Sequence, residues 1–431
     1  MKANSIKVKE CLRVYWIKHF IFCTSLFIFS LLFCSCKEEV TEAVPLTKEI
    51  KLGAIFDLSG SLSESGRGGK AAVELAIEKL NERYQAIGSP VRFSCEFADS
   101  KLDTSLALAA AKDMFSKGIR ILVGGPNPSA ETKAIKNYVN ENKIVVLNCF
   151  STAPSLSVPD DYIFRLITDD NSQAQAILKM LQFKNIKVII PIYRTDTYGT
   201  GLYEALKQKY LAQGGDVYQG VSYSPTSAAY QDIINQAANQ VNNARATYGA
   251  NEVAVILISY QDASNFLNAA SGVPVLRTVS WFGCDANAQR VTMTNDSVAA
   301  EFAATVKFLA PKMGIGTASY LPQIANDISI LIFNKTGLTP NVYALSTYDA
   351  VKIIAQAYNF VQQYDAEKIR DVLPHICAAY NYMGISRKLN SAGDLESANY
   401  IFWTVNPVSG GYGWESYATY LSEGDYIQIK N

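Results

Sequence analysis

Hydroxyl-bearing residues follow the predicted strands in the first third of the chain, where they are placed to bind an anion. Ser65 and Gly66 end a Ser/Gly-rich loop after the first predicted strand, Ser129 follows the third, and Ser151 and Thr152 follow the fourth. Ligands of open parallel sheets bind beyond the carboxyl ends of the strands. Hydroxyl groups and helix N-terminal amides at those ends favour an anion such as a carboxylate.

The corresponding strand ends in the middle of the chain offer two aromatic rings and one acid. Tyr198, Tyr260 and Asp285 occupy these positions. An acid favours an ammonium group, and a tyrosine ring adds a cation–π contact. Together the two sets of residues predict a site for a zwitterion. The alternative is that Thr152 and Asp285 only cap local turns and that the tyrosines have no ligand contact.

Strand-like and helix-like segments must alternate to bring these ends together. The first series has strands at 51–56, 91–97, 119–123 and 143–149, with helices at 70–84, 103–118 and 129–140. The second series has strands at 187–192, 216–223, 253–259 and 279–282, with helices at 199–213, 230–244 and 263–270. Strict alternation predicts the α/β class, with two doubly wound parallel-sheet lobes. Helices at 321–333 and 348–363 must dock on a lobe, and a strand at 400–405 needs a sheet edge.

Composition excludes several classes of function. Without the first 35 residues, the 39 basic and 39 acidic residues of the chain become 34 and 38, so nucleic acid is not an expected partner. The only histidine left is His375, which argues against a Ser-His-Asp triad or a histidine-rich metal site. We therefore expect no metal and no cofactor. The four remaining cysteines lack CxxC spacing and are expected to be buried thiols, with one disulfide left open.

The N-terminus has the pattern of an export signal. A basic stretch precedes an apolar run that ends at Cys36, after which the chain becomes polar. The sequence Phe33-Cys34-Ser35-Cys36 resembles a bacterial lipobox, which implies cleavage before Cys36 and its acylation. The alternative is an uncleaved transmembrane anchor. In both cases the folded part lies in the cell envelope, outside the cytoplasm.

Several segments taken together resemble the bacterial branched-chain amino acid (Leu/Ile/Val) binding proteins of ABC transporters. They include the loop from Gly53 to Gly66, the turn Ser151-Thr152-Ala153-Pro154, the motif Tyr198-Gly199 and the motif Gly283-Cys284-Asp285. The resemblance implies the type I periplasmic binding fold, with two lobes joined by three hinge crossings near residues 166–168, 305–308 and 384–386. It divides the chain into a lipoprotein signal peptide (1–35), a lipidated tether (36–48), lobe 1 (49–166 plus 306–384) and lobe 2 (167–305 plus 385–431).

The same resemblance assigns roles to individual positions. It implies ligand contacts for Ser65, Gly66, Ser129, Ser151, Thr152, Tyr198, Tyr260 and Asp285. In this reading Ser151 and Thr152 hold the carboxylate of the ligand, and Asp285 binds its amino group. Ser65 stands where relatives carry a bulky ring, and Glu131 in the first turn of a predicted helix would repel an anion.

These observations lead to a function and its alternatives. We expect a lipid-anchored receptor, not an enzyme, that captures a small amino-acid-like or amide ligand between two lobes. Its partners would be an ABC permease or a membrane sensor. The alternatives are a carboxylate-dependent hydrolase and a surface adhesion or scaffold lipoprotein with a cleft that binds nothing.

Overall fold

The computed structural model describes residues 48–317, 320–383 and 386–430. The predicted signal peptide, the lipidation at Cys36 and all but the last residue of the tether lie outside these ranges. Within Lys48–Asn431 the chain packs as one unit, so contacts between its two sheets belong to a single body. No helix among the described residues combines the length and the apolar character needed to span a bilayer.

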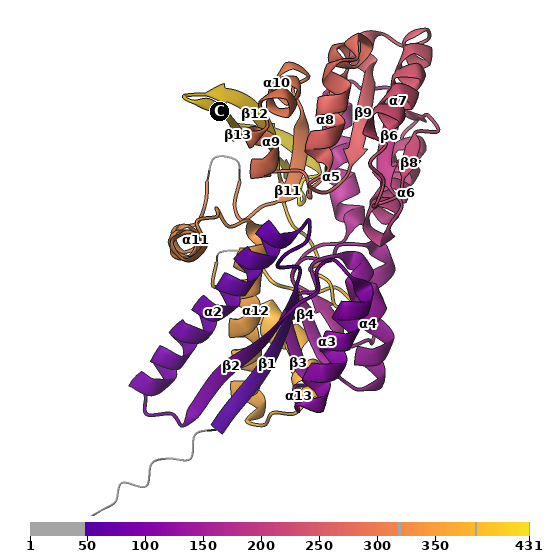
Figure 1. The fold of residues 1–431 in the computed structure, drawn as a ribbon. Helices are drawn as coiled ribbons and strands as arrows, with labels where there is room; N and C mark the ends of the chain where they lie inside the picture. Colours follow the sequence, from indigo (N-terminus) through magenta and orange to yellow (C-terminus); the bar gives the residue numbers. More distant parts are fainter. Residues whose placement is uncertain (1–47, 318–319, 384–385, 431) are drawn as a thin grey trace, which may run out of the picture. The chain divides into compact units, whose positions relative to one another are not determined.

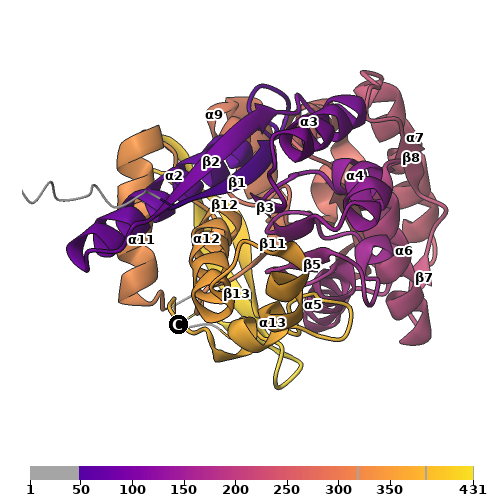
Figure 2. The same ribbon diagram turned by 90° about the horizontal axis from the view of Figure 1, so that it is seen from below.

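The first sheet is parallel throughout and has the strand order β2-β1-β3-β4-β5. Its strands are β1 (Lys48–Phe56), β2 (Val91–Asp99), β3 (Ile121–Gly124), β4 (Val145–Asn148) and β5 (Ile163–Arg165). Helices α3 (Thr104–Ser116) and α4 (Ser129–Glu141) cover one face. Helices α2 (Ser63–Ala86), α12 (Val342–Val361) and α13 (Ala366–Ala379) cover the other, and α11 (Gln323–Thr336) packs on α2 (Figures 1 and 2).

Alternating side chains explain why both faces of this sheet are covered. In β1, Ile55 points to the face of α3 and α4, whereas Phe56 points to the face of α2 and α12. Leu122 and Val123 divide in the same way in β3. Since successive side chains of a strand point to opposite faces, apolar residues at consecutive positions require a layer of helices on each side.

The second sheet is mixed. Its order is β14-β13-β12-β11-β10-β9-β6-β7, with β8 also paired to β6. The strands are β6 (Val188–Arg194), β7 (Asp216–Val217), β8 (Val221–Tyr223), β9 (Val253–Ile258), β10 (Ser280–Phe282), β11 (Leu309–Met313), β12 (Tyr400–Val408), β13 (Gly411–Leu421) and β14 (Tyr426–Ile429). Its helices are α5 (Asp170–Phe183), α6 (Thr197–Ala212), α7 (Tyr230–Arg245), α8 (Ala263–Ser271), α9 (Val291–Asn295) and α10 (Ser297–Thr305). Pairing is parallel from β6 to β11 and antiparallel from β11 to β14.

The second crossing lies later than expected. The prediction ended lobe 2 at residue 305 and assigned residues 306–384 to lobe 1. However, β11 pairs in parallel with β10 and antiparallel with β12, so residues 309–313 belong to the second sheet. The chain leaves this sheet only after Met313, and the prediction of a crossing at 305–308 is wrong. The predicted α/β class with two parallel-sheet lobes is confirmed, and lobe 1 and lobe 2 below mean the two sheets with their helices.

No disulfide joins the cysteines within the described ranges. Cys95, Cys149, Cys284 and Cys377 are all free thiols; Cys95 is half-buried and the others are buried. In the described ranges, no group of three or more His, Cys, Asp or Glu side chains is arranged to hold a metal ion.

Candidate functional site

A buried cavity between the two lobes, which we name the Asp285 cavity, collects most of the predicted site residues. Its volume is about 40 Å³. Six of the predicted residues line it: Ser65, Ser129 and Thr152 from lobe 1, and Tyr198, Tyr260 and Asp285 from lobe 2. The rest of the wall consists of Leu62, Asn127, Phe150, Ala286, Arg290 and Tyr343. The strand ends of both sheets therefore meet in one place.

Gly66 and Ser151 support this cavity without lining it. A Cβ atom on Gly66 would lie 1.9 Å from the carbonyl oxygen of Asp57, so glycine is needed for α2 to approach β1 this closely. The Ser151 hydroxyl lies 2.7 Å from the hydroxyl of Thr132 and donates to the carbonyl oxygen of Pro126 at 3.1 Å. Both residues position their neighbours, and this geometry gives no support to a direct ligand contact for either.

Buried side chains hold the turn that presents Thr152. Asn148 Oδ1 accepts hydrogen bonds from the two N–H groups that precede Thr152, each at 2.8 Å. Arg165 donates to the carbonyl oxygens on either side of Thr152, at 3.0 and 3.1 Å. Arg165 is fully buried and pairs with Asp394, which arrives from the last part of the chain. The turn is thus fixed by the first sheet and by the segment around Asp394, which pairs with β5, and Thr152 remains in the cavity wall.

The lobe 1 side of the cavity presents hydrogen-bond donors. Asn127 Oδ1 accepts from the N–H of Asp57 at 3.2 Å, which fixes the orientation of the amide. Its Nδ2 is buried, and no hydrogen-bond partner for it exists among the described residues. Ser129 stands at the first position of α4, and its Oγ accepts from the N–H of Ala153 at 3.2 Å. Asn127 Nδ2 and the hydroxyls of Ser129 and Thr152 can all donate to an anion.

Glu131, the acid in the first turn of α4, does not repel an anion bound by these donors. Glu131 is almost fully buried, at 1% exposure. Burial raises the pKa of Glu131 to about 8, and the charge of Asp57 acts in the same direction. Glu131 is therefore mainly protonated at neutral pH. The repulsion of an anion that the sequence predicted does not operate.

The lobe 2 side of the cavity presents one carboxylate with two tyrosine donors. Asp285, 5% exposed, accepts a hydrogen bond from the Tyr198 hydroxyl at 2.5 Å. It also accepts one from the Tyr343 hydroxyl, which comes from α12 of lobe 1. Burial, and after it the charge of Asp285, raises the pKa of both tyrosines, so both remain donors at neutral pH. The carboxylate attracts a cation and at the same time ties the two lobes together.

A second acid lies behind Asp285 and was not predicted. Asp170, at the start of α5, is fully buried, and its Oδ1 accepts from Gln173 Nε2 at 2.7 Å. Burial, and after it the charge of Asp285, raises the pKa of Asp170 well above its ordinary value. This shift favours the neutral form of Asp170. Asp170 could not be identified from the sequence, because only the folded structure brings it close to Thr152 and Asp285.

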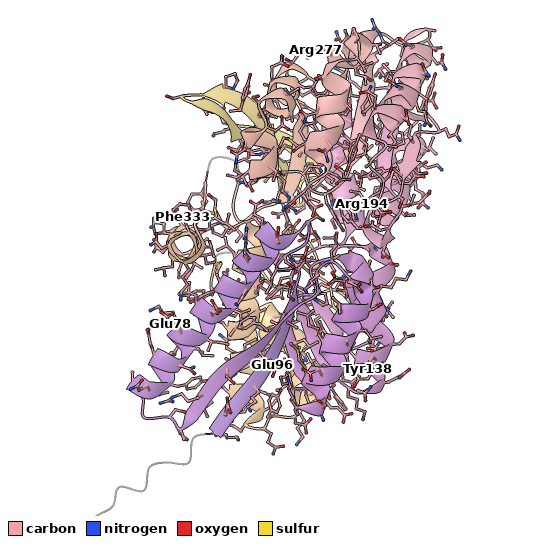
Figure 3. The ribbon with its side chains drawn as sticks, viewed as in Figure 1. Glu78, Glu96, Tyr138, Arg194, Arg277 and Phe333 are labelled. Atoms are coloured by element: carbon pink, nitrogen blue, oxygen red, sulfur yellow. The ribbon has the colours of Figure 1, made fainter. Side chains whose placement is uncertain are left out.

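The aromatic wall differs in one respect from the prediction. The rings of Tyr198 and Tyr260 are stacked, with centroids 5.3 Å apart. Arg194, labelled at the end of β6 in Figure 3, lies over the Tyr260 ring at 3.6 Å from its centroid. The cation–π contact of Tyr260 is therefore made by the protein itself, and Tyr260 offers a ligand mainly its remaining edge and hydroxyl.

Arg290 is a cavity residue that the sequence analysis missed. It is 5% exposed, and its Nε donates to the carbonyl oxygen of Ala286 at 2.7 Å. Its Nη1 lies 3.4 Å from Ser65 Oγ and 3.9 Å from a carboxylate oxygen of Glu64, both in α2 of lobe 1. Arg290 follows Asp285 on an irregular segment without periodicity, so only its closeness in sequence to Asp285 could have indicated it.

Comparison with known proteins connects this geometry to a family. Residues 69–404 match the family model described as the receptor family ligand binding region. An uncharacterized protein of Methanocaldococcus jannaschii is 29% identical over 394 residues, covering 86% of this chain and 91% of that protein.

Solved structures show the same architecture. LivJ from Streptococcus pneumoniae, a branched-chain amino acid transporter substrate binding protein in complex with isoleucine, has a TM-score of 0.70 at 18% identity, covering 86% of this chain and 99% of its own. The leucine binding protein LivK from Thermotoga maritima also has a TM-score of 0.70 at 18% identity, covering 87% of this chain and 99% of its own. The predicted type I periplasmic binding fold is confirmed.

Proposed function

This chain belongs to the family described as the receptor family ligand binding region, and we propose that it is an extracytoplasmic receptor that binds a small amino-acid-like solute between its lobes. The observation that carries the proposal is the polarity of the Asp285 cavity. One wall holds Asn127, Ser129 and Thr152 as donors, and the facing wall holds the carboxylate of Asp285. This arrangement matches the two charged ends of a zwitterion.

The energetics are adequate for such a ligand. A hydrogen bond to a charged group contributes about 1.5–3 kcal/mol net. Three or four of them would supply much of the about −8 kcal/mol that corresponds to micromolar binding. The Asp285 cavity holds only about 40 Å³, and Thr152 and Asp285 in its wall are each 5% exposed. The lobes must therefore separate both to admit a ligand and to make room for it. Hinge opening and closure is the usual motion of two-lobed binding proteins.

The membrane context is part of the proposal. LivJ is described as a transporter substrate binding protein, and an ABC-type permease is accordingly the partner we propose, with a membrane sensor as the other. We propose that residues 1–35 are removed and that an acylated Cys36 anchors the receptor in the cell envelope. One acyl chain binds a membrane only marginally, so stable anchoring requires more than one.

Binding can be tested with a matched set of ligands. The twenty L-amino acids, γ-aminobutyrate and small amides are first screened against the purified full-length protein by thermal shift. The best ligand is then titrated by calorimetry beside its decarboxylated amine and its deaminated acid, which each lack one charged end. The proposal predicts saturable binding of the zwitterion and at least tenfold weaker binding of both analogues.

The same experiment separates the alternatives. Recovery of the ligand unchanged after long incubation supports a receptor, whereas a product would support a hydrolase. Absence of any thermal shift across the panel would favour a scaffold protein. Equal affinity for the zwitterion and either analogue would contradict the two-ended site.

A further inference from the structure

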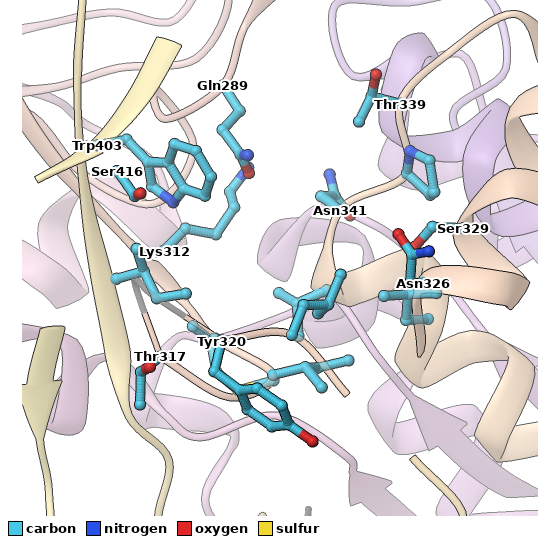
Figure 4. A pocket seen from close by; sticks show the side chains of 18 residues that line it. Gln289, Lys312, Thr317, Tyr320, Asn326, Ser329, Thr339, Asn341, Trp403 and Ser416 are labelled. Atoms are coloured by element: carbon cyan, nitrogen blue, oxygen red, sulfur yellow. The ribbon is translucent and has the colours of Figure 1, made fainter. Parts of the chain in front are cut away.

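A second and larger cavity, named here the Lys312 cavity, lies where β11 leads toward α11. Its volume is about 470 Å³, within the roughly 300–1,000 Å³ typical of small-molecule sites. Strands β11, β12 and β13 supply one wall, and α11 and the start of α12 supply the other (Figure 4). The described residues that line it are all different from those that line the Asp285 cavity.

A buried cation lies in the wall of this cavity. Lys312, the next-to-last residue of β11, is 3% exposed. Its Nζ donates to the carbonyl oxygen of Ala288 at 2.9 Å and lies 5.4 Å from the centre of the Tyr343 ring. An ammonium group has three N–H donors, and no ion pair of Lys312 with an acidic side chain is found within the described ranges.

The charge of Lys312 persists at neutral pH. Burial, and after it the neighbouring charge of Arg290, lowers the pKa of Lys312 to about 8. Asp285 and Glu64 act in the opposite direction. The ammonium form therefore still predominates at pH 7. A buried charge without a close counter-ion costs free energy, and an anion placed beside it would offset that cost.

The remaining wall is mainly apolar. Ile401 and Leu345 are buried and face the cavity, and the half-buried indole of Trp403 lies near Lys312 (Figure 4). Gln289 approaches the same region with an amide group (Figure 4). Small-molecule sites are typically apolar cavities with a few convergent polar groups, and a flat ring packs well on an indole face.

We propose that the Lys312 cavity is a second ligand site, which binds a small organic anion with a flat apolar body, such as an aryl carboxylate. The carboxylate pairs with the ammonium group of Lys312, and the ring packs between Trp403 and the aliphatic side chains of α12. The two cavities share no lining residue among those described, so either proposal can fail without the other.

Three probes with one ring system test the charge requirement. Indole-3-acetate, neutral indole and cationic tryptamine are titrated into the purified full-length protein by calorimetry at pH 7. Saturable binding of indole-3-acetate, at least tenfold tighter than that of indole or tryptamine, is the expected result. Equal affinities for the three probes, or no binding of indole-3-acetate, would overturn the proposal.

Variants locate the probe. Lys312→Met removes the ammonium group and keeps the chain length, and Ser329→Trp places a bulky ring in the cavity from the α11 wall. Each should weaken indole-3-acetate at least tenfold, whereas Lys133→Met, which removes the same charge from an exposed position of α4, should leave its affinity within twofold. Thermal melts by circular dichroism establish that each variant is folded. Because the two variants change opposite walls of the cavity, the test can still be made if one of them fails to fold. Wild-type affinity in folded Lys312→Met would place the probe elsewhere, and an equal loss in Lys133→Met would assign the effect to net charge; either result would refute the second site.

Discussion

Replacing Asp285 by Asn should remove most of the affinity for a ligand with an ammonium group while leaving the fold intact. Asp285 is 5% exposed and accepts hydrogen bonds from Tyr198 and Tyr343. An Asn side chain has nearly the same shape, and its carbonyl oxygen can still accept one tyrosine hydroxyl. What it lacks is the negative charge that faces the ammonium group.

The magnitude follows from the bonds that are lost. A hydrogen bond to a charged partner contributes about 1.5–3 kcal/mol, and one or two such bonds join an ammonium group to Asp285. We therefore expect a loss of about 2–4 kcal/mol in binding free energy, which is roughly 30- to 1,000-fold in Kd. The loss should be absent for the deaminated analogue, because that molecule has no ammonium group.

Calorimetry of wild type, Asp285→Asn and a control variant measures this difference. Asp232→Asn is a suitable control, since Asp232 is an exposed residue of α7 and carries the same change of charge. Wild-type affinity in a folded Asp285→Asn protein would remove Asp285 from the ligand site. An equal loss in Asp232→Asn would show that net charge, and not contact, controls binding.

Three further predictions concern the donor wall and its support. Thr152→Val should weaken carboxylate ligands by about 1–3 kcal/mol, because a partner is left unpaired; unchanged affinity by calorimetry would limit Thr152 to a structural role. Arg165→Met should lower the free energy of unfolding in urea by about 3–5 kcal/mol, because Asp394 is left as an unpaired buried charge; a loss below about 1 kcal/mol would refute this. Glu131→Gln should raise stability at pH 8 by up to about 4 kcal/mol. The folded pKa of Glu131, about 8, exceeds its ordinary value of 4.5, so wild-type stability falls as pH rises between these values. Unfolding curves at pH 4 and pH 8 should show that fall in wild type and not in the variant.

The sequence predicted the sheet-forming segments well because both lobes are built from local alternation. The buried runs of β1, β3 and β4 and the caps of their helices are local signals; for example, Asp103 accepts from two N–H groups at the start of α3, as expected of a cap. The predicted crossing between the lobes at residues 305–308 was wrong for a different reason. β11 joins the second sheet through pairing with β12, about ninety residues later, and no local pattern encodes that contact.

The same distinction explains what was missed in the candidate site. Tyr343 was overlooked because the predicted helix began at residue 348, whereas α12 begins at Val342 after the cap Asn341. Asn341 directly after Pro340 is typical of a helix start, and it was the sequence signal for the true beginning of this helix. Ser151 was predicted to face a ligand because it follows a strand, but its hydroxyl turns toward Thr132. Which of two adjacent hydroxyls faces a cavity depends on tertiary packing.

A crystal structure of the protein with the ligand identified in the panel is the decisive experiment for the two-ended site. One molecule should lie in the Asp285 cavity, with its ammonium group within hydrogen-bond distance of Asp285. Its carboxylate should accept from Thr152 and from Asn127 Nδ2. A ligand bound in the reverse orientation, or one bound outside this cavity, would rule out the proposed roles of Asp285 and Thr152.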